Sequence, residues 1–429
     1  MKKKLATRNF ILIAIALLLG CVFSFISFSL PFSNYIFKGF ARSFNLGLAF
    51  TDGISNTYEV EVSNIYAGEK NDAANYAKDV IQDLVLDKYN DGVVEVVDSN
   101  KVSITIPDTT LDQSVLLNFL EMKLESGEEA ETLVNGSHIE SANYQMSGTN
   151  HGVYIEFTSA GKKAFADLTS KAVEKAGDGA KEGTIYIYLG KDYENGQQLS
   201  VPEIKEGYAY ITMSNKEACK LYASRLMNSR YGINLSTENE PVITHAYFNT
   251  VQKVMVAVVV GLIVVGTLVF FAVKYRELGW LTLLALVFFF LANEITLCLL
   301  PAFCLNLGGV MGMVFGFVIT AITLFILLEK CSQEYKLGKK LPVSFKMGYK
   351  KSLGINIDIF ASMAVFAILG LIFTSGNMFT FSLALIMAIA FGALTSLLLM
   401  RGLMKMYLYI NPTKAQKINF KREVEENEK

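Results

Sequence analysis

Two acidic residues of this 429-residue chain lie in strongly apolar sequence, and they are its best candidates for chemistry. Asp358 stands just inside the apolar stretch 355–373, and Glu294 lies within the stretch 278–300. Each stretch is long enough to cross a bilayer, where an ionisable side chain is costly and marks a functional site by default. A carboxyl group there can be charged in one state and neutral in another. We therefore treat both as candidate proton-relay residues. The alternative is that both lie near the interfaces, where water reaches them.

Other residue types give no pattern for catalysis. The sequence contains no Ser-His-Asp, HExxH or GxSxG arrangement, and the histidines His138, His151 and His245 are scattered. Of the five cysteines, only Cys219 belongs to the large polar region, and no CxxC or Cys/His spacing is present. We expect no catalytic residues, no metal site and no cofactor, so the sequence does not indicate an enzyme.

The apolar stretches predict a six-helix membrane bundle. The composition is 52% hydrophobic and 18% charged, which indicates one region in lipid and another in water. The predicted membrane helices are 9–30, 251–273, 278–300, 307–328, 355–373 and 378–400. The first is preceded by a basic segment and is followed by no small-residue cleavage site, so we interpret it as a retained helix and not a signal peptide.

The basic residues set the expected orientation. They gather in residues 1–8, in a predicted loop 329–354 and in a basic-to-mixed tail 401–429, whereas the turns 301–306 and 374–377 carry no charge. The loop contains Lys339, Lys340, Lys350 and Lys351. The positive-inside rule then places both termini in the cytoplasm and residues 31–250 outside the cytoplasmic membrane.

Residues 31–250 predict a large extracytoplasmic α+β domain. Strand-like runs at 57–62, 93–98, 101–106, 183–189 and 208–213 alternate with helical periodicity at 72–86, 161–173 and 216–227. Acidic residues outnumber basic ones in this region by roughly two to one. It has no basic patch with interleaved aromatic residues, so a nucleic-acid partner is excluded.

A run of glycines opens the fourth apolar stretch. Gly308, Gly309, Gly312 and Gly316 follow one another at intervals of one, three and four positions. Small residues at such intervals let membrane helices approach closely. No Lys-Ser/Thr pair follows, so the run is not a phosphate loop. We predict a helix-packing surface.

At this point several segments, taken in order, resemble the SecD family of the RND superfamily. Residues 46–60, LGLAFTDGISNTYEV, are similar to the family's LGLDLxGG…EV opening, with departures at Ala49 and Asp52. Residues 153–169, 185–204 and 208–227 resemble its later strand and helix elements. Residues 326–359 resemble its IFERIREELRxGKSxxxAxxxGFKRAFxTIxDA segment, and the positions that match or are close are Glu329, Gly338, Lys339, Gly348, Lys350, Lys351 and Asp358. Arg401 stands where the family's last helix usually ends in arginine.

The resemblance implies a function and partners. SecD assists the Sec channel in exporting preproteins, pairs with a second six-helix subunit, SecF, and uses proton flow through the joint bundle. We therefore expect a SecF-like subunit, the Sec translocation channel, unfolded preproteins and the lipid bilayer as partners.

One departure from the family bears on proton coupling. The family's fourth helix carries an Asp-x-Asn motif, and alignment places Ile322 at the aspartate and Leu324 at the asparagine. Neither side chain can carry a proton. Three readings remain open: an export-assisting subunit coupled to protons through Asp358 and Glu294, a scaffold that has lost coupling, and a small-molecule or lipid transporter of the same superfamily.

Overall fold

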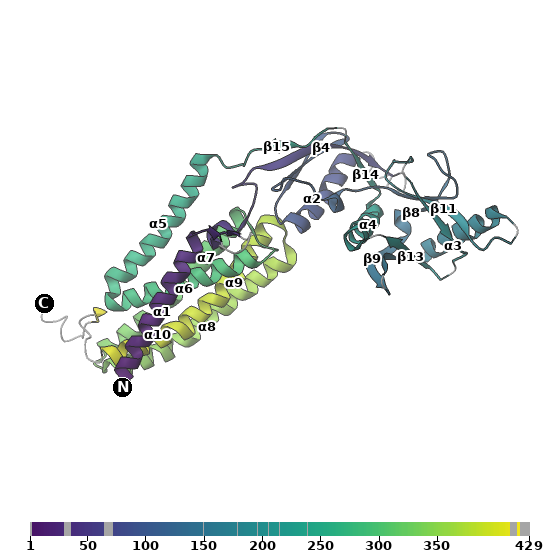
Figure 1. The fold of residues 1–429 in the computed structure, drawn as a ribbon. Coiled ribbons are helices and arrows are strands. Elements are labelled where there is room, and N and C mark those ends of the chain that lie inside the picture. Colours follow the sequence, from purple (N-terminus) through teal and green to yellow (C-terminus); the bar gives the residue numbers. More distant parts are fainter. Residues whose placement is uncertain are drawn as a thin grey trace. The chain divides into compact units, whose positions relative to one another are not determined.

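The computed structural model describes residues 2–29, 36–63, 72–148, 150–177, 179–194, 196–204, 206–213, 215–237, 239–411 and 418–420. Most of the predicted tail beyond residue 411 therefore lies outside the described residues. The chain divides into two compact units. The first, made of Met1–Thr51, Tyr89–Asp91 and Ala246–Lys429, is mainly helical, and the second, Asp52–Lys88 with Gly92–His245, mixes strands and helices (Figure 1).

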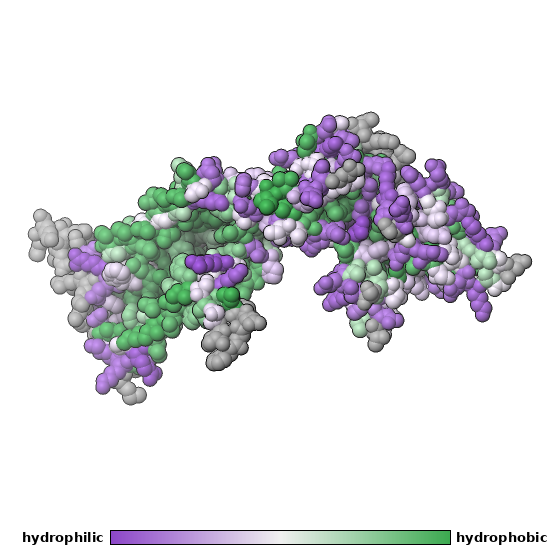
Figure 2. Space-filling view, turned by 45° about the horizontal axis from the view of Figure 1, so that its top comes forward, coloured by the Kyte–Doolittle hydropathy of each residue, from purple (hydrophilic) through white to green (hydrophobic). Residues whose placement is uncertain are grey.

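Six helices of the described residues are long and apolar enough to cross a membrane, as the sequence predicts. Hydrophobic side chains cover much of the surface of this helical unit (Figure 2). The last helix is continuous and includes a π-helical segment, Leu394–Leu399. The helices are α1 Lys2–Phe25, α5 Thr250–Tyr275, α6 Glu277–Leu299, α7 Leu307–Lys336, α8 Leu341–Phe373, α9 Gly376–Ala393 and α10 Met400–Ile410.

The predicted loop 329–354 is mostly helical, which corrects the sequence interpretation. α7 continues to Lys336, and α8 begins at Leu341 with Pro342 in its first turn, so only residues 337–340 separate them. Gly338 in this turn has φ +83°, a conformation that glycine adopts without strain. The tail also begins as a helix, because α10 extends to Ile410. Hydropathy marks where lipid ends, whereas a helix continues as long as its own hydrogen bonds do.

Glycines bring α7 and α9 into close contact. A Cβ atom added at Gly308 would overlap the backbone oxygen of Asn377, and one at Gly316 would overlap the Cβ of Ala388. A Cβ at Gly312 would lie 2.8 Å from the Cβ of Ala384. These three glycines are four residues apart and form one ridge along α7. Gly309 lies instead against the ring of Phe303, where a Cβ would come within 2.9 Å.

The second unit contains three antiparallel sheets. In the first, β4 is central and pairs with β6, β14 and β15; the second has the order β12-β11-β7-β8, and the third β13-β10-β9. The strands are β4 Gly53–Val62, β5 Val93–Asp98, β6 Lys101–Ile106, β7 Leu120–Lys123, β8 Thr132–Asn135, β9 Ile139–Ser147, β10 Asn150–Phe157, β11 Gly183–Leu189, β12 Gln197–Val201, β13 Tyr208–Met213, β14 Ile233–Ser236 and β15 Val242–Thr244. Four two-residue strands belong to the helical unit: β1 Phe28–Ser29, β2 Ile36–Phe37, β3 Asn45–Leu46 and β16 Cys304–Leu305.

Three helices supply buried apolar faces to this unit: α2 Ala73–Tyr89, α3 Ser159–Ala176 and α4 Lys216–Asn228. α2 buries Ala74, Ala77, Ile81 and Val85, which follow helical spacing. α3 and α4 share one core with the strands β7 to β13, where the rings of Phe157 and Phe165 stack with centroids 4.5 Å apart. The α+β architecture of the polar region is therefore as predicted.

Candidate functional site in the helical bundle

Glu294 lies in a cavity of about 360 Å³ within the helical unit. α6 supplies Glu294 and Asn293, α1 supplies Ser24, and Phe44 and Met313 complete part of the wall. Ser24 is buried, and its hydroxyl donates a hydrogen bond to the Glu294 carboxylate. The lining is otherwise mostly apolar, so the carboxyl group has one close polar partner in a poorly solvated setting.

Asn293 adds a second polar group to the same cavity. Its side-chain nitrogen donates to the backbone oxygen of Phe289 at 3.0 Å. Its side-chain oxygen is buried and has no hydrogen-bond partner among the described residues. Buried polar atoms without partners are uncommon and require an explanation such as a bound water or a functional role. The cavity is therefore lined by a carboxyl, a hydroxyl and a carboxamide whose oxygen has no partner among the described residues.

A second polar contact joins α7 and α8. The side-chain nitrogen of Asn356 donates to the backbone oxygen of Thr323 at 3.1 Å, and the Asn356 side-chain oxygen has no partner among the described residues. The hydroxyl of Thr320 donates to Gly316. Sequence reasoning missed Asn356, although a buried amide in an apolar helix is itself a signal. None of these groups titrates, so this contact orients helices and does not carry charge.

The structure does not bring the two predicted acids together. Asp358 is exposed on α8, and its carboxylate makes no hydrogen bond or ion pair with the described residues, whereas Glu294 faces its own cavity. Ile322 is also exposed, on α7. An exposed carboxylate on a membrane helix requires water or a protein partner against it.

The four lysines of the predicted loop that the sequence analysis names fall into two groups. Glu334 is almost fully buried and pairs with Lys339 and Lys351, the latter at 2.5 Å. This carboxylate links the end of α7 to the first turns of α8 and fixes the turn between them. Lys340 and Lys350 are exposed. The first pair is thus structural, and the second pair remains available to solvent or lipid.

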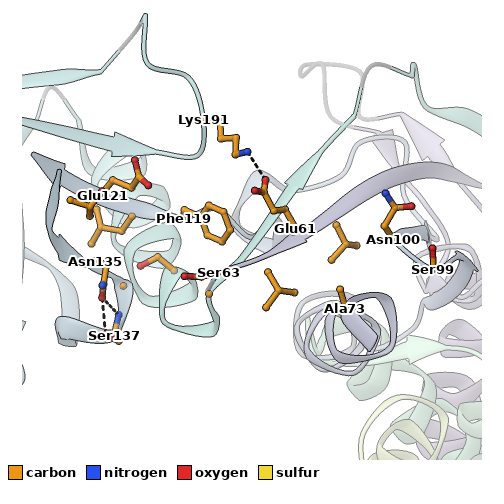
Figure 3. A pocket seen from close by; sticks show the side chains of 17 residues that line it. Glu61, Ser63, Ala73, Ser99, Asn100, Phe119, Glu121, Asn135, Ser137 and Lys191 are labelled. Carbon is orange, nitrogen blue, oxygen red and sulfur yellow. Dashed lines mark hydrogen bonds and ion pairs between the residues drawn. The ribbon is translucent and has the colours of Figure 1, made fainter. Parts of the chain in front are cut away.

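The α+β unit contains a separate cleft of about 700 Å³, drawn in Figure 3. Among the residues that line this cleft, the ammonium group of Lys191 lies 2.8 Å from the Glu61 carboxylate. The side chain of Phe119 lies between Glu61 and Asn135 (Figure 3). The hydrogen bond that Lys191 donates to the Glu61 carboxylate raises the pKa of Lys191. Lys191 and Glu61 also line a neighbouring cavity with Tyr188 and Arg225. The two cavities thus share this ion pair.

Over the described ranges of the chain, no group of three or more His, Cys, Asp or Glu side chains is arranged to hold a metal ion.

The proteins of similar sequence described below are protein translocase subunits. No protein-family profile matches the chain. It is 26% identical over 307 residues to the protein translocase subunit SecD of Dictyoglomus turgidum, covering 70% of this chain and 72% of that protein. It is 24% identical over 269 residues to SecD of Alicyclobacillus acidocaldarius, covering 61% of this chain and 58% of that protein.

The fold has a solved counterpart. A crystal structure of SecDF in a super-membrane-facing form superposes with a TM-score of 0.71 at 16% identity. That superposition covers 94% of this chain but only 57% of the SecDF chain.

These likenesses define the class of protein first: an RND-like membrane bundle with a large α+β domain inserted after the first helix. Within that class the chain is a SecD-like, multi-pass membrane protein.

Proposed function

We propose that this protein is an accessory subunit of the Sec protein translocase that assists the export of preproteins across the cytoplasmic membrane. The observation that supports this most is the sequence match to SecD over 70% of the chain, joined to the SecDF-like fold over 94% of it. In this function both termini lie in the cytoplasm and the α+β unit lies outside, in agreement with the basic residues at 1–8 and 329–354.

A SecF-like subunit is the partner that completes the bundle in this proposal. The SecDF chain extends well beyond the part that this chain matches. Met311, Phe315 and Ile322 are all exposed on α7 at helical spacing, although α7 also makes close contacts with α8 and α9. Exposed Asp358 on α8 also calls for a covering partner or water. These features support a second bundle against α7 and α8.

Proton linkage, in this proposal, depends mainly on Glu294. Its cavity, its contact with Ser24 and the orphaned oxygen of Asn293 provide a protonation site inside one bundle. Asp358 can contribute only together with groups that a partner supplies. A second candidate function is a scaffold without proton coupling, and Ile322 at the family's aspartate position is the observation that favours it.

The cleft of the α+β unit is the proposed place for a preprotein segment. Figure 3 shows Phe119 between Glu121 and Asn135 on one side and Glu61 on the other, and this mixture of apolar and polar groups suits contact with varied sequences. A photo-crosslinker at Phe119 should capture a translocating chain, whereas one at Lys163, an exposed residue of α3, should not.

The experiment for this function measures preprotein transport into vesicles that contain the Sec channel, a SecF-like subunit and this chain. We expect the chain to increase transport, and an unchanged rate with the partner present would overturn the translocase role. The proton gradient separates the two candidates. If stimulation requires the gradient, the chain is coupled; if it does not, and Ile322→Asp introduces a requirement, the chain is an uncoupled scaffold.

A further inference from the structure

A small basic cleft lies between the start of α8 and α10, apart from the sites above. Its volume is about 280 Å³. Phe345, Met404 and Leu408 form an apolar floor, and Lys346, Arg401 and Lys405 stand around it. Phe345 and Met404 are buried, whereas the three basic side chains are exposed.

Tyr349 holds one of these cations in place. The Arg401 guanidinium lies 4.7 Å from the centre of the Tyr349 ring, a cation–π arrangement. The Tyr349 hydroxyl donates to the backbone oxygen of Leu397 at 2.9 Å, within the π-helical segment that precedes α10. The hydroxyl hydrogen bond fixes the ring, and the ring face holds the planar guanidinium, which matches a phosphate with two parallel N–H groups.

The charges at this cleft differ from several other cations at the same end of the bundle. Lys339 and Lys351 share an ion pair with Glu334, and Lys274 lies 3.2 Å from Glu329. Lys346, Arg401 and Lys405, like the exposed Lys340 and Lys350 outside the cleft, make no ion pair with a carboxylate in the part of the chain that the structure describes. Three unneutralised cations around one apolar floor favour an anionic amphiphile.

The position of the cleft is that of a lipid headgroup. No charged residue occurs from Gly376 to Met400, and Arg401 follows at once. α10 then buries Met400, Leu403, Met404 and Tyr407 on one face and exposes Arg401 and Lys405 on another. A helix of this kind lies at the boundary between acyl chains and headgroups.

We propose that this cleft binds the phosphate of an anionic glycerophospholipid, with Arg401 as the bidentate donor, Lys346 and Lys405 as supporting charges, and the apolar floor against the glycerol and upper acyl carbons. Basic pockets between membrane helices are suited to such headgroups. The proposal requires only that the helices span a membrane, so it is independent of the translocase role.

Native mass spectrometry of the full chain in neutral detergent tests this, with dioleoyl phosphatidylglycerol as the probe and dioleoyl phosphatidylcholine as the reference lipid. We expect preferential binding of phosphatidylglycerol to the wild-type chain. The double variant Arg401→Gln/Lys405→Gln should weaken that binding by about tenfold or more. The matched control Lys340→Gln/Lys350→Gln removes the same charge from exposed residues that do not line the cleft and should change it by less than about twofold.

Two further measurements keep the result specific. Arg401→Lys keeps the charge but removes the planar donor pair, so it should weaken phosphatidylglycerol binding by an intermediate amount. Phosphatidylglycerol should also raise the melting temperature of the wild-type chain and not of the double variant. Equal losses of phosphatidylglycerol binding in the two double variants would contradict the proposed cleft and show that the lipid is attracted by the overall basic charge. Displacement of the lipid by glycerol phosphate at the same concentration would contradict a phospholipid ligand and show that the cleft binds a soluble anion.

Discussion

Ser24 on α1 donates a hydrogen bond to the carboxylate of Glu294 on α6, across 270 positions of sequence. The two helices are close at this level, because a Cβ added at Gly20 would lie 2.8 Å from a methyl carbon of Leu291. α1 therefore contributes a polar side chain to the interior of the helical unit. It supplies the polar partner of an acid that α6 places beside a mostly apolar cavity.

The first prediction concerns this pair. Glu294→Gln keeps the shape and an acceptor for Ser24 but cannot release a proton, so it should abolish the gradient-dependent part of transport. Ser24→Ala removes a hydrogen bond worth about 1 kcal/mol and should shift the gradient dependence only partly. Transport is measured in vesicles with and without a proton gradient. Asp358→Asn is the comparison variant: if it abolishes gradient dependence while Glu294→Gln does not, the proton site is at Asp358.

The second prediction concerns the glycine ridge on α7. Gly316→Ala forces a methyl group against Ala388, so it should lower the free energy of unfolding by about 1–3 kcal/mol. Gly266→Ala on α5 is a matched control, because a Cβ there meets nothing within 4 Å. The control should be neutral or slightly stabilising, since alanine is the better helix former. Unfolding of both variants is followed in mixed micelles by circular dichroism. Equal effects at the two positions would show that α7 and α9 are not tightly packed at Gly316.

Much of the architecture could be predicted, because its causes are local in sequence. Long apolar runs such as that of α5 predict membrane helices, and runs of branched and aromatic residues such as that of β11 predict strands. Each signal is contained in one segment.

The polar contacts could not be predicted in the same way, because they join distant segments. Nothing near Glu294 in sequence indicates Ser24 as its partner, and nothing near Asn356 indicates the backbone oxygen of Thr323. The short turn at 337–340 could not be predicted for a different reason. Glu334, Lys339 and Lys351 are typical of a solvated loop by residue type, yet here their ion pairs lie between two helices.

The third prediction concerns Lys123, which is almost fully buried in the α+β unit. Its ammonium group donates to the backbone oxygens of Gly127 and Glu128 at 3.2 and 2.9 Å, and pairs with Glu121 at 3.0 Å. It also lies 4.7 Å from the centre of the Tyr193 ring. These contacts close the turn that follows β7.

Lys123→Met keeps the apolar stem but leaves the backbone oxygens of Gly127 and Glu128 without this donor and Glu121 without its cation, so it should cost about 2–4 kcal/mol. Amide hydrogen exchange in the full chain should show faster exchange at β7 and β8. Lys175→Met, at an exposed ion pair with Glu125, is the control and should change stability by less than about 1 kcal/mol. Unchanged exchange in Lys123→Met would mean that the buried charge contributes nothing to this hairpin.

The fourth prediction is a pH dependence at Asp112. This side chain accepts from the backbone nitrogen of Ser114 at 2.8 Å and pairs with Lys88 at 2.5 Å. Burial alone would raise the pKa of Asp112, but the hydrogen bonds from Lys88 and Ser114 outweigh it and hold the pKa at about 2. Because the folded pKa lies below the unfolded value of 3.8, the charged form stabilises the fold above about pH 4. This contribution is lost as the pH falls from there through about 2.

Asp112→Asn should therefore be less stable than the wild type near neutral pH and should approach it near pH 2. The side chains of Lys88 and Asp112 are 46% and 36% exposed, so solvent screens the pair, and we expect a difference of only about 0.5 kcal/mol. Thermal unfolding of the full chain in detergent at a series of pH values measures it. Lys88→Met should reproduce most of the loss, and the double variant should add little to it. A difference that stays constant down to pH 2 would show that Asp112 does not titrate in this range.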